Sequence, residues 1–135
     1  MKERIVGDVA IMPSQFDAAL RVERIARLDE RYQVEAYFFV LEGLEHTQKK
    51  LKRTGKSKQE RHVSGQELCD GLRSLALKQF GPLARTVFQQ WGVSKTRDFG
   101  EIVYILIQND MLGKTDSDSI EDFTDVYDFD EAFGF

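Results

Sequence analysis

The chain has 135 residues, 19 of them basic and 23 acidic, and its formal net charge at pH 7 is −4. This length predicts a single domain with a real hydrophobic core, and the 41% hydrophobic content is ordinary for globular proteins. No stretch approaches the roughly 20 apolar residues of a membrane span, and the charged N-terminus has no signal-peptide pattern. The single cysteine, Cys69, excludes an internal disulfide, so we expect a cytoplasmic protein that does not enter a membrane.

The near-neutral total hides two strongly charged segments. Residues 47–62, the basic segment, carry seven basic residues and one acidic residue. Residues 115–135, the acidic tail, carry eight acidic residues and no basic one. We therefore divide the chain into an N-terminal arm over 1–13, a helical domain over 14–114 that contains the basic segment, and the acidic, aromatic tail.

Two amphipathic helices are predicted before the basic segment. The first begins after Ser14 and fades near Asp29, and the second spans about residues 32–50. The residues expected on their buried sides are Phe16, Ala19, Leu20 and Ile25 in the first helix, and Val34, Tyr37, Phe38, Leu41 and Leu44 in the second, with Phe39 and Val40 widening the stripe. We interpret this aromatic stripe as core packing rather than as a ligand-binding box.

The basic segment reads TQKKLKRTGKSKQERH and contains one large apolar residue. Gly55 and Ser57 loosen it, so we predict that it starts as the frayed end of a helix and continues as a mobile loop. One interpretation is a solvated linker, and the other is a phosphate-binding loop. The candidate phosphate contacts are Lys49, Lys50, Lys52, Arg53, Lys56, Lys58 and Arg61.

Residues 61–113 predict three further helices. Ser64 and Glu67 match a capping box, so the first of these helices begins directly after Ser64. The pair Gly81-Pro82 separates it from the second helix, which ends at Trp91 with Gly92 as its C-cap. We expect Trp91, the only tryptophan, to anchor the core.

The third of these helices spans about residues 99–111, with Asp98 as its N-cap and an apolar run over 102–107 that predicts full burial. Aromatic side chains interrupt the acidic tail, so part of it should dock on the domain or on a partner. The tail pattern also allows a short hairpin with strands near 120–123 and 126–129. The predicted fold is mainly α, a single domain of about five helices, with this hairpin and a winged-helix-like C-terminal half as an allowed variant.

No catalytic or metal-binding motif is present. His46, His62 and Cys69 lack the paired spacing of zinc ligands, and the chain has no glycine-rich phosphate loop. The triplet Asp98-Phe99-Gly100 occurs in kinases, but the other kinase motifs are missing. We therefore expect a protein that is not an enzyme and has no metal and no cofactor.

Several blocks of the chain resemble one known family. RHVSGQELCDGLR, FGPLARTVFQQWGV, DFGEIVYILI and YDFDEAF, with AYFFVLEGLEHT upstream, are similar to the small signature protein shared by the bacterial PVC superphylum. The resemblance covers about residues 14–133, and its blocks occur in family order. It implies a cytoplasmic housekeeping protein with unspecific DNA and RNA binding and no assigned catalytic residues. It implies no defined site, so the basic segment is an inference from charge.

The expected function is non-specific DNA or RNA binding, with phosphates contacted through the basic segment. Base readout in the major groove is not expected, because the third helix is apolar and a wing made from the tail would be acidic. The alternative is a protein-interaction adaptor whose acidic, aromatic tail holds a basic partner. We also predict that the tail competes with phosphate for the basic segment.

Overall fold

The computed structural model describes residues 13–134, which form helices joined by loops, with no strand in that range. The mainly α prediction is confirmed. The five predicted helices are present as α1 (Pro13–Leu28), α2 (Val34–Lys50), α4 (Gly65–Phe80), α5 (Ala84–Trp91) and α6 (Thr96–Gln108). The additional elements are the short helices α3 (Lys58–Arg61) and α7 (Phe129–Phe133) and the 3₁₀ turns η1 (Gly81–Leu83) and η2 (Ile120–Phe123). The predicted arm, apart from Pro13, lies outside the described residues.

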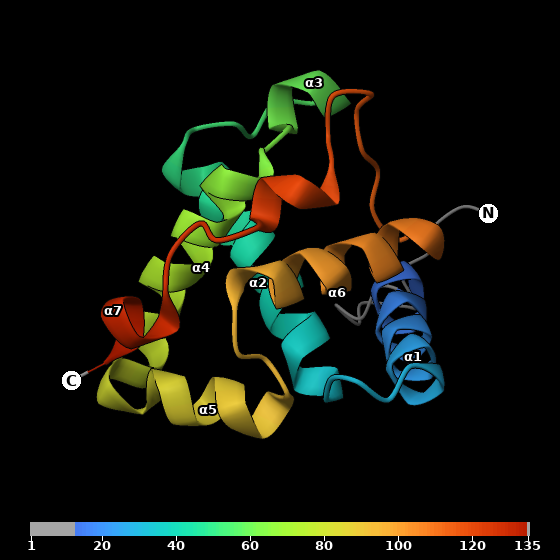
Figure 1. Cartoon of the computed structure of the whole chain (residues 1–135). Coiled ribbons are helices and arrows are strands. Elements are labelled where there is room, and N and C mark those ends of the chain that lie inside the picture. Colours follow the sequence, from blue (N-terminus) through green and yellow to red (C-terminus); the bar gives the residue numbers. More distant parts are fainter. Residues whose placement is uncertain (1–12, 135) are drawn as a thin grey trace, which may run out of the picture.

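Helix α2 is the centre of the fold. It packs against α4 and α1, and α6 crosses it, with α1 and α4 lying on opposite sides of the crossing (Figure 1). Fully buried side chains from these helices meet in one core, among them Tyr37 and Val40 of α2, Leu72 of α4 and Leu106 of α6. None of the helices in the described range is long and apolar enough to span a membrane.

The predicted helix ends are mostly confirmed. The Ser64 hydroxyl accepts the N–H of Glu67 at 3.1 Å, and the Glu67 carboxylate accepts the N–H of Ser64 at 3.0 Å. Gly92 ends α5 with a left-handed φ of 85°, a conformation that favours glycine. The N-cap assigned to Asp98 is wrong, because α6 begins at Thr96 and Asp98 lies in its first turn. There it accepts the backbone N–H groups of Ser94 and Lys95.

The buried faces of the first two helices differ from the predicted stripes. In α1, Ile25 is buried as predicted, but Phe16 is 59% exposed and Leu20 is 44% exposed, and Val22, which the predicted stripe omits, is buried. Among the described elements α1 packs chiefly against α2, so only a narrow stripe of it is covered. In α2, Phe38 is exposed because Phe39 and Val40, on the adjoining faces, take the core positions.

Residues 115–134 contain two short helical elements, η2 and α7, joined by turns and irregular chain, so the hairpin prediction is wrong within this range and the winged-helix variant has no wing there. Phe123, Phe129 and Phe133 are buried, which confirms that part of the tail docks on the domain. The Thr96 hydroxyl secures η2 by donating to the carbonyl of Phe123 at 2.6 Å. The spacing of Phe129 and Phe133 is helical, and Asp128 caps α7, which explains why helix replaces strand.

Phe88 lies at the centre of an aromatic cluster that closes the core near α5. Its ring centroid lies 5.5 Å from that of Phe39, 5.5 Å from that of Phe99 and 5.2 Å from that of Phe133. Trp91 joins the cluster with its ring centroid 5.8 Å from Phe88, but it is only partly buried. The predicted core anchor therefore lies at the edge of the cluster, and Phe88 occupies its middle.

Candidate functional site

The basic segment contains less loop than predicted. Its first four residues end α2, and residues 58–61 form α3, so residues 51–57 alone connect the two helices. The end of α2 is a Schellman motif, in which the N–H of Lys52 donates to the carbonyl of Lys49 at 3.1 Å and the N–H of Arg53 to that of Gln48 at 2.7 Å. Ser57 caps α3. Helix ends therefore fix the backbone on both sides of the connection.

Lys52 has a left-handed backbone conformation, with a φ of 59°. Glycine is the usual residue at this position of a Schellman motif, since any side chain costs roughly 1–2 kcal/mol there. Lys52 therefore places a positive charge just beyond the end of α2, although its backbone conformation is strained. Residues held in such conformations tend to cluster at functional sites.

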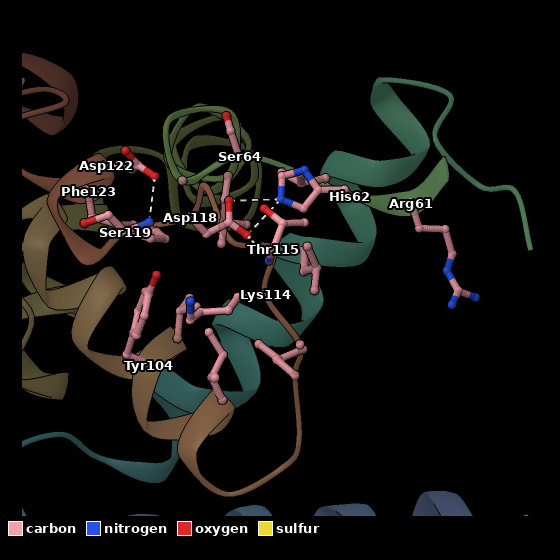
Figure 2. A pocket seen from close by; sticks show the side chains of 18 of the residues that line it. Arg61, His62, Ser64, Tyr104, Lys114, Thr115, Asp118, Ser119, Asp122 and Phe123 are labelled. Atoms are coloured by element: carbon pink, nitrogen blue, oxygen red, sulfur yellow. Dashed lines mark hydrogen bonds and ion pairs between the residues drawn. The ribbon is translucent and has the colours of Figure 1, made fainter. Parts of the chain in front are cut away.

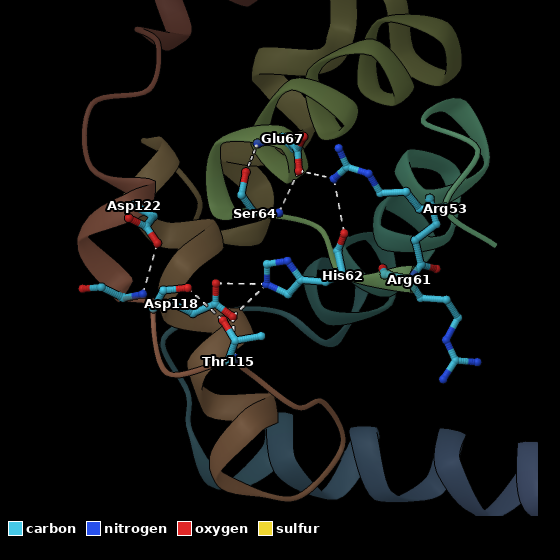
Figure 3. A network of polar contacts seen from close by, with 11 residues as sticks. Arg53, Arg61, His62, Ser64, Glu67, Thr115, Asp118 and Asp122 are labelled. Carbon is cyan, nitrogen blue, oxygen red and sulfur yellow. Dashed lines mark hydrogen bonds and ion pairs between the residues drawn. The ribbon is translucent and has the colours of Figure 1, made fainter. Parts of the chain in front are cut away.

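Arg53 differs from the other candidate cations because its side chain is held by hydrogen bonds within the protein. Its guanidinium donates to the Glu67 carboxylate at 2.5 Å and to the carbonyl of His62 at 3.3 Å (Figure 3). Arg53, followed by the N–H of Ser64, lowers the pKa of Glu67. Because Glu67 also closes the cap of α4, Arg53 ties the connection to α4 and is better explained as a structural residue than as a phosphate contact.

The other candidate cations whose side chains are described are exposed; they are Lys49, Lys50, Lys52, Lys56 and Arg61. Lys49 makes a 3.7 Å ion pair with Glu45 in which both side chains are 68% exposed, and such a pair contributes little. The remaining four form no ion pair with any other residue in the range 13–134. They belong to the last residue of α2, the connection that follows it and the last residue of α3. Figure 1 shows α3 at one end of the molecule.

The acidic tail meets the basic segment at His62 rather than at its lysines. Nε2 of His62 lies 3.0 Å from the carboxylate of Asp118, which also accepts the N–H of Thr115 at 2.8 Å (Figure 3). Burial opposes the charged form of Asp118, but the hydrogen bonds from Thr115 and His62 outweigh it and the pKa is lowered. Two other tail carboxylates pair with arginines outside the basic segment; the pairs are Glu121 with Arg97 and Asp130 with Arg85.

A groove with a volume of about 710 Å³ lies where the basic segment and the tail meet (Figure 2). Its floor is apolar and includes Leu44 of α2 and Ile107 of α6. Arg61 and His62 line it from the basic segment, and Lys114 lines it from the connection between α6 and the tail. No local pattern predicted this groove, because its lining comes from four separate stretches of chain, residues 40–48, 59–68, 103–107 and 111–123.

Helices α2 and α4 also bring together His46 and Ser74, which the sequence did not pair. Nε2 of His46 lies 3.0 Å from Oγ of Ser74. A nucleophilic serine also needs a group that orients the histidine and backbone donors for an oxyanion. Both residues lie inside helices, whose N–H groups are already hydrogen-bonded, so we interpret the pair as a packing contact.

The remaining candidates for site chemistry are a thiol and metal ligands. Burial raises the pKa of Cys69 to about 12, so its side chain remains a thiol at neutral pH. Within residues 13–134, no group of three or more His, Cys, Asp or Glu side chains is arranged to hold a metal ion.

Comparison of the chain with protein-family models, with curated proteins and with solved structures gave no match. The resemblance to the small signature protein of the PVC superphylum therefore stays a prediction.

Proposed function

We propose that this protein binds DNA or RNA non-specifically by contacting phosphates through the basic segment, and that it is not an enzyme. The observation that carries the proposal is a set of four exposed cations around the end of α2 with no ion pair in the described range. These residues are Lys50, Lys52, Lys56 and Arg61. Contacts to phosphate carry affinity without reading the base sequence, which fits a lysine-rich surface.

A purely structural explanation covers only part of this set. The C-terminal end of a helix carries partial negative charge, so lysines in its last turn stabilise it by roughly 0.3–1 kcal/mol each. This accounts for Lys49 and Lys50, which end α2. It does not extend to Lys56 in the connection, nor to Lys52, whose backbone has a left-handed conformation that costs free energy for any residue other than glycine. Phosphate binding gives those two positions a role.

The test is a salt titration with fluorescent duplex DNA, single-stranded DNA and structured RNA. The variant replaces Lys49, Lys50, Lys52 and Lys56 with alanine and keeps Arg53, whose loss would also disturb the cap of α4. For unmodified protein we expect the logarithm of the affinity to fall linearly with the logarithm of salt, by about 0.9 per phosphate contact on duplex DNA and about 0.7 on single strands. The variant should have a flatter slope on every probe, by up to roughly one unit per lysine removed.

A control at another surface replaces Arg24 and Arg27, two exposed cations of α1, with alanine, and its effect is compared per charge removed. This control removes charge far along the chain from the basic segment, so it should leave most of the slope unchanged. An unchanged slope in the lysine variant, or an equal loss in the control, would remove the basic segment from the proposal.

The alternative function, a protein-interaction adaptor whose tail binds a basic partner, has less support than nucleic-acid binding. Three of the tail's aromatic side chains, Phe123, Phe129 and Phe133, pack in the core and cannot also hold a partner. Several tail carboxylates already pair with the protein's own arginines and with His62. We further propose a cytoplasmic location, where the free thiol of Cys69 would stay reduced.

A further inference from the structure

The groove beside the basic segment has the properties of a site for part of a nucleic acid. Its volume of about 710 Å³ lies within the range of small-molecule sites, roughly 300–1,000 Å³. The floor is made by apolar side chains from three elements, including Leu44 of α2, Ile107 of α6 and Phe123 of η2. A flat, largely apolar ligand with polar edges fits such a floor.

One polar group in the groove lacks a partner. The hydroxyl oxygen of Tyr104 is buried and forms no hydrogen bond with any described residue, although buried hydroxyls are usually satisfied. Tyr104 projects from α6 toward the loop of Asp118 and Ser119 (Figure 2). Burial, and then the charges of Asp118 and Asp122, raise its pKa, so it stays a neutral donor and acceptor. Because protein atoms cover this oxygen, a ligand in the groove would hydrogen-bond it only after a shift of the loop of Asp118 and Ser119.

Charged side chains of both signs line the groove. Arg61 belongs to the basic segment and is exposed, and Lys114 lies in the connection between α6 and the tail. The carboxylates come from the tail; they are Asp116, Asp118, which is held by His62 and Thr115, and Asp122, which is held by the N–H of Ser119. Phosphate would be attracted to Arg61 and repelled by the carboxylates. The carboxylates can accept the N–H groups of a nucleobase.

We propose that this groove takes one unpaired base of a single-stranded nucleic acid whose phosphates lie on the basic segment. The proposal rests on the function proposed above and adds to it a preference for single strands. A base in a duplex keeps its faces stacked and its edges paired, so it cannot enter the groove without being flipped out. A basic peptide is a poorer occupant, because its path to the groove passes a segment with seven basic residues and one acidic residue.

The test compares probes that differ in their bases but not in their charge. A thymine oligomer of about ten nucleotides is compared with an abasic oligomer of the same length, and both with a duplex, in the same salt. Stacking and hydrogen bonding of one base should make the thymine oligomer bind on the order of tenfold more tightly than the abasic one. Equal affinities would overturn the groove proposal and leave phosphate binding by the basic segment standing. If neither oligomer binds, both proposals fail.

A variant that fills the groove tests whether the preference for the thymine oligomer arises there. Leu112 lines the groove and is partly buried, so Leu112→Trp should fill it without changing any charge. We expect this variant to bind the abasic oligomer normally and to lose its preference for thymine. The control is Leu83→Trp, the same substitution at a residue of η1 that is 64% exposed and outside the groove, which should keep the preference. Retention of the preference in Leu112→Trp would refute the groove.

A second measurement needs no variant, in case Leu112→Trp does not fold. Methyl NMR spectra of the unmodified protein are recorded with thymidine 5′-monophosphate and, separately, with ribose 5-phosphate. The proposal expects shifts at the methyl groups of Leu44 and Ile107 with the nucleotide alone. Identical spectra with both ligands would show that the base does not enter.

Discussion

Replacement of Gly71 by alanine should destabilise the protein by forcing α2 and α4 apart. These helices approach closely where Gly71 of α4 faces Thr47 of α2. A Cβ atom at residue 71 would overlap Oγ1 of Thr47 and would lie 2.9 Å from its Cβ. Thr47 cannot easily move aside, because it is β-branched, 2% exposed and donates to the carbonyl of Gly43 at 2.7 Å.

The expected loss combines two opposing effects. Overpacking by one methyl group costs about 1–3 kcal/mol, and the better helix propensity of alanine returns up to about 1 kcal/mol. We therefore expect the free energy of unfolding to fall by about 1–2 kcal/mol and the melting temperature by roughly 3–10 °C. Urea denaturation and thermal melting, both followed by circular dichroism, measure these quantities.

Two comparisons make the Gly71→Ala result specific. Gly113→Ala should be neutral or stabilising by up to about 1 kcal/mol, because a Cβ there meets no atom within 4 Å. Thr47→Ala removes Oγ1, so the double variant with Gly71→Ala should lose less stability than the sum of the two single variants. If Gly71→Ala is as stable as the unmodified protein, or the two losses simply add, the close-contact reasoning is refuted.

Other variants and conditions test the helix cap, the tail and the surface carboxylates. Ser64→Ala should lower the free energy of unfolding by about 1 kcal/mol through loss of the α4 cap, and an unchanged value would contradict that role. Truncation after Thr115 removes three buried phenylalanines, each worth about 3–5 kcal/mol, so cooperative melting should disappear; a folded truncated protein would refute docking as a requirement. Glu67 and Asp118 have lowered pKa values in the folded protein, so the stability they contribute is present above about pH 4 and is lost as the pH falls further. Denaturation across that range should show the decline, and Glu67→Gln should make it shallower.

Local sequence patterns predicted most of the helices and their ends. Ser64 with Glu67, Gly81-Pro82 and Gly92 act through hydrogen bonds and dihedral angles within a few residues, so their effects can be read from local sequence. Charge segregation likewise located the basic segment as the candidate surface. These features need no knowledge of which helix packs on which.

The packing of the helices on one another sets which residues of each pattern are buried and which cations lack an ion pair within residues 13–134. Phe16 and Phe38 continue their apolar stripes but face solvent, because the neighbouring helices cover only part of α1 and α2. Arg53 looked equivalent to the lysines around it until α4 brought Glu67 within 2.5 Å.

The groove could not be predicted for the same reason. Leu44, His62, Tyr104 and Lys114 are far apart in the chain, and only the packing of α2, α6 and the tail brings them to one surface. Tyr104 stood in an apolar run that the sequence assigned to the core, yet its hydroxyl lacks a partner in the described range. Short-range hydrogen bonding and dihedral preferences therefore fixed the helices, whereas long-range packing decided where a ligand could enter.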